Sequence, residues 1–141
     1  MLVHNYGLLL RIHPDSPVPI YEQIVAQLTF SIASGGLETG SLIPSVRDLA
    51  SRLVVHPNTV ARAFQELERQ GIVVARRGRG MEVTSEAPAL CRALRQQIVR
   101  GHIRDALREA AASALPPEEV RRLVDEEFSK VNGQRSSREK H

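Results

Sequence analysis

Two short amphipathic segments, 46–53 and 57–70, follow each other with only a few residues between them. In each segment the apolar residues recur at the spacing of one helix face, which predicts two helices joined by a tight turn. After Gly71 the apolar period shortens to two residues, and the runs 72–75 and 81–84 predict the strands of a hairpin. This order of elements predicts an α+β fold built on a helix-turn-helix.

The segments on either side complete the predicted domains. Residues 8–12 predict a short strand, and apolar residues that recur every four positions over 18–34 predict a helix that ends at two glycines. We therefore expect a first domain over 8–84. Residues 88–132 predict a module of helices, and the Gly-, Ser- and charge-rich end, 133–141, predicts a flexible tail.

The net charge of +3 is unevenly distributed along the 141 residues. Seven of the 19 Lys and Arg residues lie between Pro44 and Gly80, against only three of the 16 acidic residues, and all seven are arginines. A localised basic segment is typical of a nucleic-acid surface, because the planar fork of arginine matches phosphate and guanine. A solvated face with nearby counter-charges explains the same count, so charge alone leaves both interpretations open.

The second helix of the pair begins with side chains suited to reading bases. In a helix-turn-helix, the start of the second helix enters the major groove. Here it consists of His56, Pro57, Asn58 and Thr59, with Arg62 one turn further on the outward face. Asparagine pairs with adenine, and threonine bonds a base or touches a thymine methyl. The alternative is that Asn58 and Thr59 only cap the helix, since both residue types are common at helix starts.

The tip of the predicted hairpin consists only of arginine and glycine, in the order Arg76-Arg77-Gly78-Arg79-Gly80. Glycine lets a backbone approach another surface closely, and arginine inserts into a narrow minor groove. We therefore expect Arg77, Gly78 and Arg79 to contact DNA beside the second helix. The alternative, an ordinary solvated loop, is disfavoured because the tip contains no acidic residue.

Spaced motifs add a more specific signal: Pro-Ile-Tyr-Glu-Gln-Ile at 19–24, Gly40 followed by Pro-Ser-Val-Arg-Asp-Leu-Ala at 44–50, Asn-Thr-Val-Ala-Arg-Ala-Phe at 58–64, Leu-Glu-Arg-Gln-Gly at 67–71 and Gly-Arg-Gly at 78–80. In this order, over about 18–84, they resemble the winged helix-turn-helix domain of the GntR family of bacterial transcriptional regulators. The resemblance implies three helices and a hairpin wing that bind a double-stranded DNA operator. It also implies that Arg47 contacts DNA from the start of the second of the three helices. We expect Ser45, which precedes that helix and can cap its free N–H groups, to contact DNA as well.

One position departs from the family pattern. The family usually has glycine where Val54 stands, in the turn between the two helices. A β-branched residue resists the positive φ that glycine adopts readily. We therefore expect either a slightly different turn, with a different angle of the helix that follows, or a strained Val54.

Beyond the hairpin, the chain carries more apolar side chains than a few helices cover by themselves. Gly101 marks a kink or a stop in the first of these helices, and Pro116-Pro117 begin the next. We expect a second copy of the chain to cover this surface, giving a homodimer. The residues expected at the dimer interface are Leu90, Leu94, Ile98, Ile103, Leu107, Leu123, Val124 and Phe128.

The short helical end resembles the YtrA subfamily of GntR regulators. That resemblance implies a repressor that dimerises through two C-terminal helices and is encoded beside the ABC transporter genes that it represses. A symmetric dimer predicts a palindromic operator, with the two reading helices roughly 34 Å apart. Two alternatives remain: a monomer whose end packs back on the first domain, and an adaptor whose end docks a different protein.

Other functional classes have less support. The histidines and the single cysteine, Cys91, show neither metal-ligand spacing nor a nucleophile-base arrangement, so we expect no catalysis, metal or cofactor. RNA binding is disfavoured because aromatic residues, which stack on bases, make up only 4% of the chain. A hairpin of helices leaves little room for an effector pocket, so the sequence does not identify an effector. Two alternatives are open: a ligand that binds between subunits, and control by the amount of protein alone. The absence of a signal peptide, a membrane span and paired cysteines predicts a cytoplasmic protein.

Overall fold

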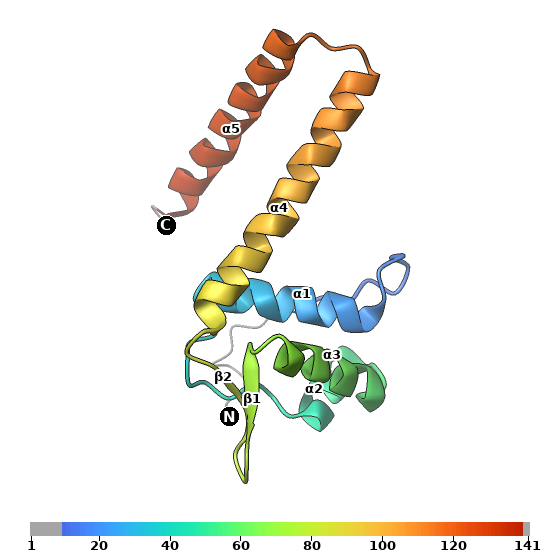
Figure 1. The fold of residues 1–141 in the computed structure, drawn as a ribbon, viewed down its shortest axis with the longest axis vertical. Coiled ribbons are helices and arrows are strands. Elements are labelled where there is room, and N and C mark those ends of the chain that lie inside the picture. The colour runs from blue at the N-terminus through green and yellow to red at the C-terminus, as the bar shows by residue number, and fades with distance from the viewer. Residues whose placement is uncertain (1–9, 140–141) are drawn as a thin grey trace. The chain divides into compact units, whose positions relative to one another are not determined.

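The computed structural model describes residues 10–139 and contains five helices and two strands among them (Figure 1). The chain forms two compact units, which divide after Gln97. No helix in the described range is long and apolar enough to cross a membrane. The elements are α1 (Ile20–Ala33), α2 (Val46–Leu53), α3 (Pro57–Arg69), β1 (Val73–Arg76), β2 (Gly80–Val83), α4 (Ala87–Ala112) and α5 (Pro117–Glu139).

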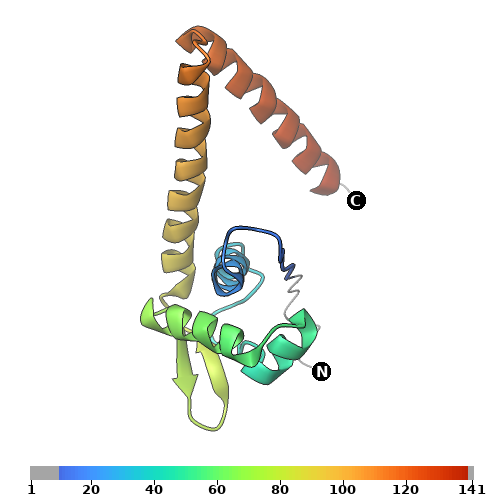
Figure 2. The ribbon, with the colours of Figure 1, turned by 90° about the vertical axis from the view of Figure 1, so that its right-hand side faces the viewer.

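The first unit is built around the contact between α1 and α3, with α2 packed on α3 and the β1–β2 hairpin attached to the end of α3. In both views α1 lies on one side of α3, and the hairpin projects on the other side (Figures 1 and 2). The predicted α+β helix-turn-helix with a hairpin is confirmed. Its core consists of Ile24, Leu28, Ile32, Leu37, Ile43, Leu49, Ala50, Val60, Ala63, Phe64, Leu67, Ile72, Val73, Val83, Ala87 and Cys91.

The strand predicted over 8–12 is wrong where the structure describes it: residues 10–12 belong to no strand, and 8–9 lie outside the described residues. Two glutamines of α1 explain the difference. The Gln27 amide accepts from the Arg11 N–H and donates to the Arg11 carbonyl, both at 2.7 Å. The buried Gln23 amide holds the N–H and the carbonyl of His13 in the same way. Side chains one helical turn apart thus satisfy the backbone groups that a neighbouring strand would otherwise bond.

A further backbone segment bonds to β2 and attaches the hairpin to the rest of the first unit. In the pairing of β1 with β2, Val73 lies opposite Val83 and Arg76 lies opposite Gly80. Residues 40–43 run beside β2, because the Ile43 N–H donates to the Met81 carbonyl and the Val83 N–H donates to the Ser41 carbonyl, each at 2.9 Å. Two-stranded hairpins are marginal alone. This extra pairing therefore braces the base of the hairpin and leaves its tip projecting.

Each of the first four helices is followed by a residue with positive φ: Gly35, Val54, Gly71 and Ala114. The residue after it donates its N–H back to a carbonyl in the last turn of the helix, as Val55 does to Ala50 at 3.1 Å. This ending normally uses glycine, because a Cβ is strained there. Val54 has φ 54° and ψ 51°, close to the ideal left-handed values. The turn therefore keeps the glycine-like geometry, and Val54 carries the strain.

Replacing Val54 with glycine relieves this strain. We expect Val54→Gly to raise the free energy of unfolding by about 1 kcal/mol, which is the strain of a β-branched left-handed residue less the added entropy of an unfolded glycine. Urea unfolding followed by circular dichroism measures it. Val55→Gly is the control and should destabilise the protein, since Val55 packs against the core and lacks a positive φ. Equal destabilisation by both variants would contradict the strain at Val54.

The C-terminal helices differ from the prediction in two places. Gly101 does not end a helix, since α4 runs without a break from Ala87 to Ala112. The flexible tail predicted over 133–141 is helical as far as Glu139 in α5. Within this last stretch Arg135 Nε pairs with Glu139 Oε1 at 3.5 Å, and Ser137 Oγ donates to the Gly133 carbonyl at 3.1 Å. These contacts, one helical turn apart, favour the helix despite Gly133.

The first turns of α4 belong to the core of the first unit. Ala87 and Cys91 are fully buried, and Leu94 packs against the same core. The guanidinium of Arg95 lies 4.6 Å from the ring centroid of Phe30 in α1. Burial raises the pKa of the Cys91 thiol to about 11, which keeps it protonated and unreactive at neutral pH. Cys91 is therefore a packing residue.

Candidate nucleic-acid interface

The helix α3 presents one apolar and one polar face. Val60, Ala63, Phe64 and Leu67 are buried. Asn58 and Arg62 are exposed on the opposite face, and Thr59 is half-buried. Because the apolar face is fully used by the core, the polar face of α3 is the one available to a partner.

His56 caps the start of α3, although histidine is not among the usual capping residues. Its Nδ1 accepts a hydrogen bond from the Asn58 N–H at 3.1 Å, and Pro57 occupies the first helical position. The side chains of Asn58 and Thr59 make no hydrogen bond among residues 10–139. The alternative in which these two residues only cap the helix therefore has no support in the structure. His56, predicted to contact DNA, has one ring nitrogen committed to the helix.

Ser45 caps α2 in the same manner, because its Oγ accepts from the Asp48 N–H at 3.1 Å. Arg47, two residues further, is exposed. Both residues were predicted to contact DNA. The structure places Arg47 at the start of α2 with its guanidinium in solvent, and it gives Ser45 a local structural role.

Two of the seven arginines between Pro44 and Gly80 are paired with carboxylates. Arg69 Nε donates to Glu66 Oε2 at 2.9 Å, and this hydrogen bond, followed by one from Gln70, lowers the pKa of Glu66 to about 2. Arg76 Nε donates to Glu82 Oε2 at 2.6 Å across the hairpin. The tip itself contains no acidic residue, but cross-strand pairing places Glu82 beside Arg76.

The other five arginines have no acidic partner within the described part of the chain. They are exposed and come from the start and end of α2, from the outward face of α3 and from the hairpin tip: Arg47, Arg52, Arg62, Arg77 and Arg79. Most of the positive charge of the segment is thus not neutralised by nearby carboxylates, and it lies on α2, on the outward face of α3 and at the hairpin tip. This distribution favours a polyanionic partner over a solvated face with neighbouring counter-charges.

The hairpin tip is a tight turn. The Arg79 N–H donates to the Arg76 carbonyl at 2.9 Å, and Gly78 and Gly80 have φ values of 75° and 115°. A Cβ at Gly78 would meet no atom within 4 Å, so the backbone conformation and not the space requires glycine. The turn leaves Arg77 and Arg79 exposed on either side of Gly78.

Arg62 has a neighbour that the sequence analysis did not identify. Its guanidinium carbon lies 3.9 Å from the centroid of the Tyr21 ring in α1. Contacts between residues 41 positions apart in the chain give no local sequence signal; only the packing of α1 on α3 reveals this one.

The residues predicted to form a dimer interface fall into two groups. Leu94 packs on the core of the first unit, and Leu90 lies beside Gly71 with 38% of its surface exposed. The others lie in the second unit and are exposed, from 37% for Ile98 to 65% for Phe128. They are Ile98, Ile103, Leu107, Leu123, Val124 and Phe128.

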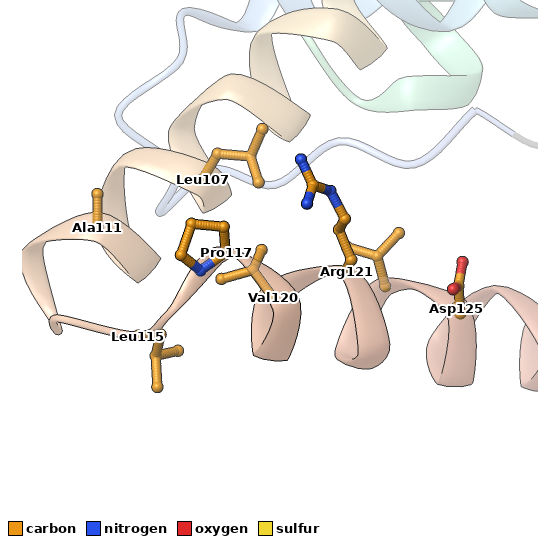
Figure 3. Close-up of a pocket in the computed structure, with 8 residues that line it drawn as sticks. Leu107, Ala111, Leu115, Pro117, Val120, Arg121 and Asp125 are labelled. Carbon is orange, nitrogen blue, oxygen red and sulfur yellow. The ribbon is translucent and has the colours of Figure 1, made fainter.

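A groove of about 520 Å³ opens between α4 and α5 in the second unit. Figure 3 shows its lining, with Leu107 and Ala111 from α4 facing Val120 and Arg121 from α5. Most of this lining is apolar, whereas α5 has no buried residue at all. No group of three His, Cys, Asp or Glu side chains that would hold a metal occurs in the described range.

The cap of α3 can be tested directly. We expect His56→Ala to lower the free energy of unfolding by about 1 kcal/mol, because the Asn58 N–H loses its acceptor. His56→Ser, which supplies a hydroxyl acceptor, should retain most of the stability. Thermal unfolding of both variants measures the difference. Equal stability of His56→Ala and the unchanged protein would show that this hydrogen bond contributes nothing.

Three comparisons place this geometry among known proteins. Residues 20–83 match the family described as bacterial regulatory proteins, gntR family. The HTH-type transcriptional repressor YtrA of Bacillus subtilis is 31% identical over 125 residues, which are 89% of this chain and 96% of that protein. A GntR family regulator from Listeria monocytogenes has 31% identity and a TM-score of 0.69, over 79% of this chain and 97% of that one.

A further solved structure, YtrA from Sulfolobus acidocaldarius, is 35% identical with a TM-score of 0.55, over 70% of this chain and 97% of that one. The matched family segment starts at α1 and ends with β2, so it contains the helix-turn-helix, the hairpin and all the predicted DNA-contacting residues. The predicted resemblance is therefore confirmed. The chain is a DNA-binding transcriptional regulator that belongs to the GntR family, within its YtrA-type group.

Proposed function

We propose that this regulator is a homodimeric repressor that binds a palindromic DNA operator. The observation that carries the proposal is the set of uncommitted polar side chains at the start of α3, namely Asn58, Thr59 and Arg62. Their helix is capped by His56, so none of them is needed to hold it. These residues read base edges in the major groove, while the exposed Arg77 and Arg79 enter the adjacent minor groove.

The remaining uncommitted arginines contact the DNA backbone. Arg47 lies at the start of α2 and Arg52 in its last turn. In a helix-turn-helix the first helix of the pair crosses the phosphate backbone, so these residues fix the register of the domain on the duplex. Arg69 and Arg76 take no part, because glutamates already bind them.

A second copy of the chain covers the apolar surface of the second unit. After the turn that joins them, α4 and α5 diverge (Figure 2), and no residue of α5 is buried. Ile103, Leu107, Val124 and Phe128 are each about half exposed or more. An isolated helix pair with such a surface is unstable in water, because most helix stability comes from packing of an apolar face. The equivalent helices of a second copy would fill the groove and restore that packing.

The two-fold symmetry of such a dimer sets the form of its operator. Two copies of α3 would read half-sites separated by about one turn of DNA, roughly 34 Å, or a multiple of it. The named relative in Bacillus subtilis is a transcriptional repressor. An ABC transporter operon is the target class that the YtrA resemblance implies, and genome-wide mapping of bound sites would identify it.

The DNA-binding residues are tested by removing Arg62 and Arg79 together. Duplexes selected from a random library by the unchanged protein serve as the probe. We expect the double variant Arg62→Ala/Arg79→Ala to bind them on the order of 100-fold more weakly at fixed salt, because it loses one base contact and one minor-groove contact. A gel shift measures the affinity. Arg69→Ala is the control from the same helix and should change it only a few-fold.

Unchanged affinity of the double variant, or failure of the library to yield any common sequence, would contradict the proposed DNA contacts. A flatter dependence of affinity on salt concentration should accompany the loss, because the variant brings two fewer positive charges to the DNA and displaces fewer counterions on binding.

The dimer is tested separately. We expect the chain to sediment as a dimer and Phe128→Glu to sediment as a monomer, because a carboxylate cannot be buried unpaired in an apolar interface. Ser129→Glu adds the same charge at the neighbouring position and should remain a dimer. A monomer formed by the unchanged protein would contradict the proposal. It would favour the adaptor or the packing of the helices on the first unit.

A further inference from the structure

Tyr21 and Arg62 meet across the contact between the first and third helices. Tyr21 lies in the first turn of α1, and Arg62 lies in the second turn of α3. The 3.9 Å between the guanidinium carbon and the ring centroid is within the range of a cation–π contact. Arg62 nevertheless remains exposed, and Tyr21 is half-buried against the core. The ring is therefore a fixed support, and the guanidinium lies between it and solvent.

The contact with the Tyr21 ring restrains the Arg62 guanidinium and leaves its hydrogen-bond donors unused. A stacked guanidinium uses only its flat face, and its N–H groups point outward in the plane. Arg69 in the same helix and Arg76 in the hairpin are held instead by carboxylates, which accept from their Nε atoms at 2.9 Å and 2.6 Å. The Arg62 side chain makes no hydrogen bond within residues 10–139. The Arg62 guanidinium is thus restrained in position, while its N–H groups remain free to donate hydrogen bonds.

The Tyr21 ring is itself restrained. Its hydroxyl donates to Glu22 Oε1 at 3.1 Å, and its ring packs against the buried core of the first unit. The orientation of the Tyr21 ring is therefore restrained before DNA binds. A side chain whose conformation is fixed in advance loses less entropy on binding. This advantage matters most for a bidentate contact, because both donors must align with their acceptors at the same time.

Resting on the proposed function, we propose that Tyr21 is a positioning residue for Arg62 and makes discrimination for one guanine of the operator depend on its ring. In-plane donors that are held in one orientation match the O6 and N7 acceptors of guanine, whereas a phosphate accepts a mobile guanidinium equally well. The residue that sets this specificity lies in the first helix and outside the helix-turn-helix.

The experiment uses the full chain and duplexes selected from a random library by the unchanged protein. Affinities are then measured for a set of duplexes in which each base pair is changed in turn. The position at which Arg62→Ala loses discrimination identifies its guanine. We expect Tyr21→Leu to lower discrimination at that position about three- to fivefold and to leave the other positions unchanged. Tyr21→Phe, which keeps the ring, should retain most of the discrimination.

Two controls separate positioning from a general loss of structure. Phe30→Leu removes the other arginine–aromatic pair of α1, in which Arg95 lies 4.6 Å from the ring centroid, and should leave the base preferences intact. In a double-mutant cycle, Tyr21→Leu should have no further effect on discrimination once Arg62 is alanine. Because discrimination is a ratio of affinities, it does not depend on the fraction of each variant that is folded.

The outcomes distinguish this proposal from the function on which it rests. If Arg62→Ala loses one guanine preference but Tyr21→Leu keeps it, Tyr21 does not position Arg62 and the inference is overturned. A Tyr21→Leu variant that weakens all duplexes equally overturns it as well. If Arg62→Ala alters no base preference, the proposed base contact of Arg62 fails, and the positioning role falls with it.

A measurement without DNA tests the contact itself. The ring current of Tyr21 should shift the NMR signals of the Arg62 guanidinium upfield. Tyr21→Leu should abolish that shift, while Tyr21→Phe should keep it. Identical Arg62 signals in the unchanged protein and in Tyr21→Leu would contradict the stacked arrangement.

Discussion

The packing of α1 across α3 is the contact on which the first unit depends. It buries Ile24 and Leu28 against Val60 and Phe64, and these residues lie at the centre of the core. The same contact fixes which side of α3 remains open. Because α1 occupies the apolar side, Asn58 and Arg62 are left in solvent, and a ring from α1 reaches the edge of that polar side. One apolar interface thus produces both the stability of the domain and the orientation of its reading face.

The number of arginines between Pro44 and Gly80 does not by itself give the charge available to a partner, because some of these arginines are paired with carboxylates. The segment from Pro44 to Gly80 holds seven arginines, yet two of them are bound by Glu66 and Glu82. Glu82 lies outside that segment in the sequence and reaches Arg76 only through the hairpin. The unpaired arginines therefore form a smaller basic surface than the count of seven suggests. It coincides with the ends of α2, α3 and the hairpin, where a helix-turn-helix meets DNA.

Much of the fold is predictable from local pattern, because periodicity and helix starts are local properties. The bounds of α2 and α3, the Ser45 cap and the hairpin all follow from residues close to each other in the chain. The failures involve distant partners. Gln23 and Gln27 take the place of a neighbouring strand for residues 11–13. The His56 cap was missed because serine, threonine, aspartate and asparagine are the usual capping residues.

The basic segment contains arginine and no lysine. A guanidinium stays protonated throughout the physiological range, whereas a lysine amine is a target of acetylation, which removes its charge. Within this segment, the positive charge is therefore beyond the reach of lysine acetyltransferases and of acidification. A signal that releases the protein from DNA therefore cannot act by removing the charge of these arginines.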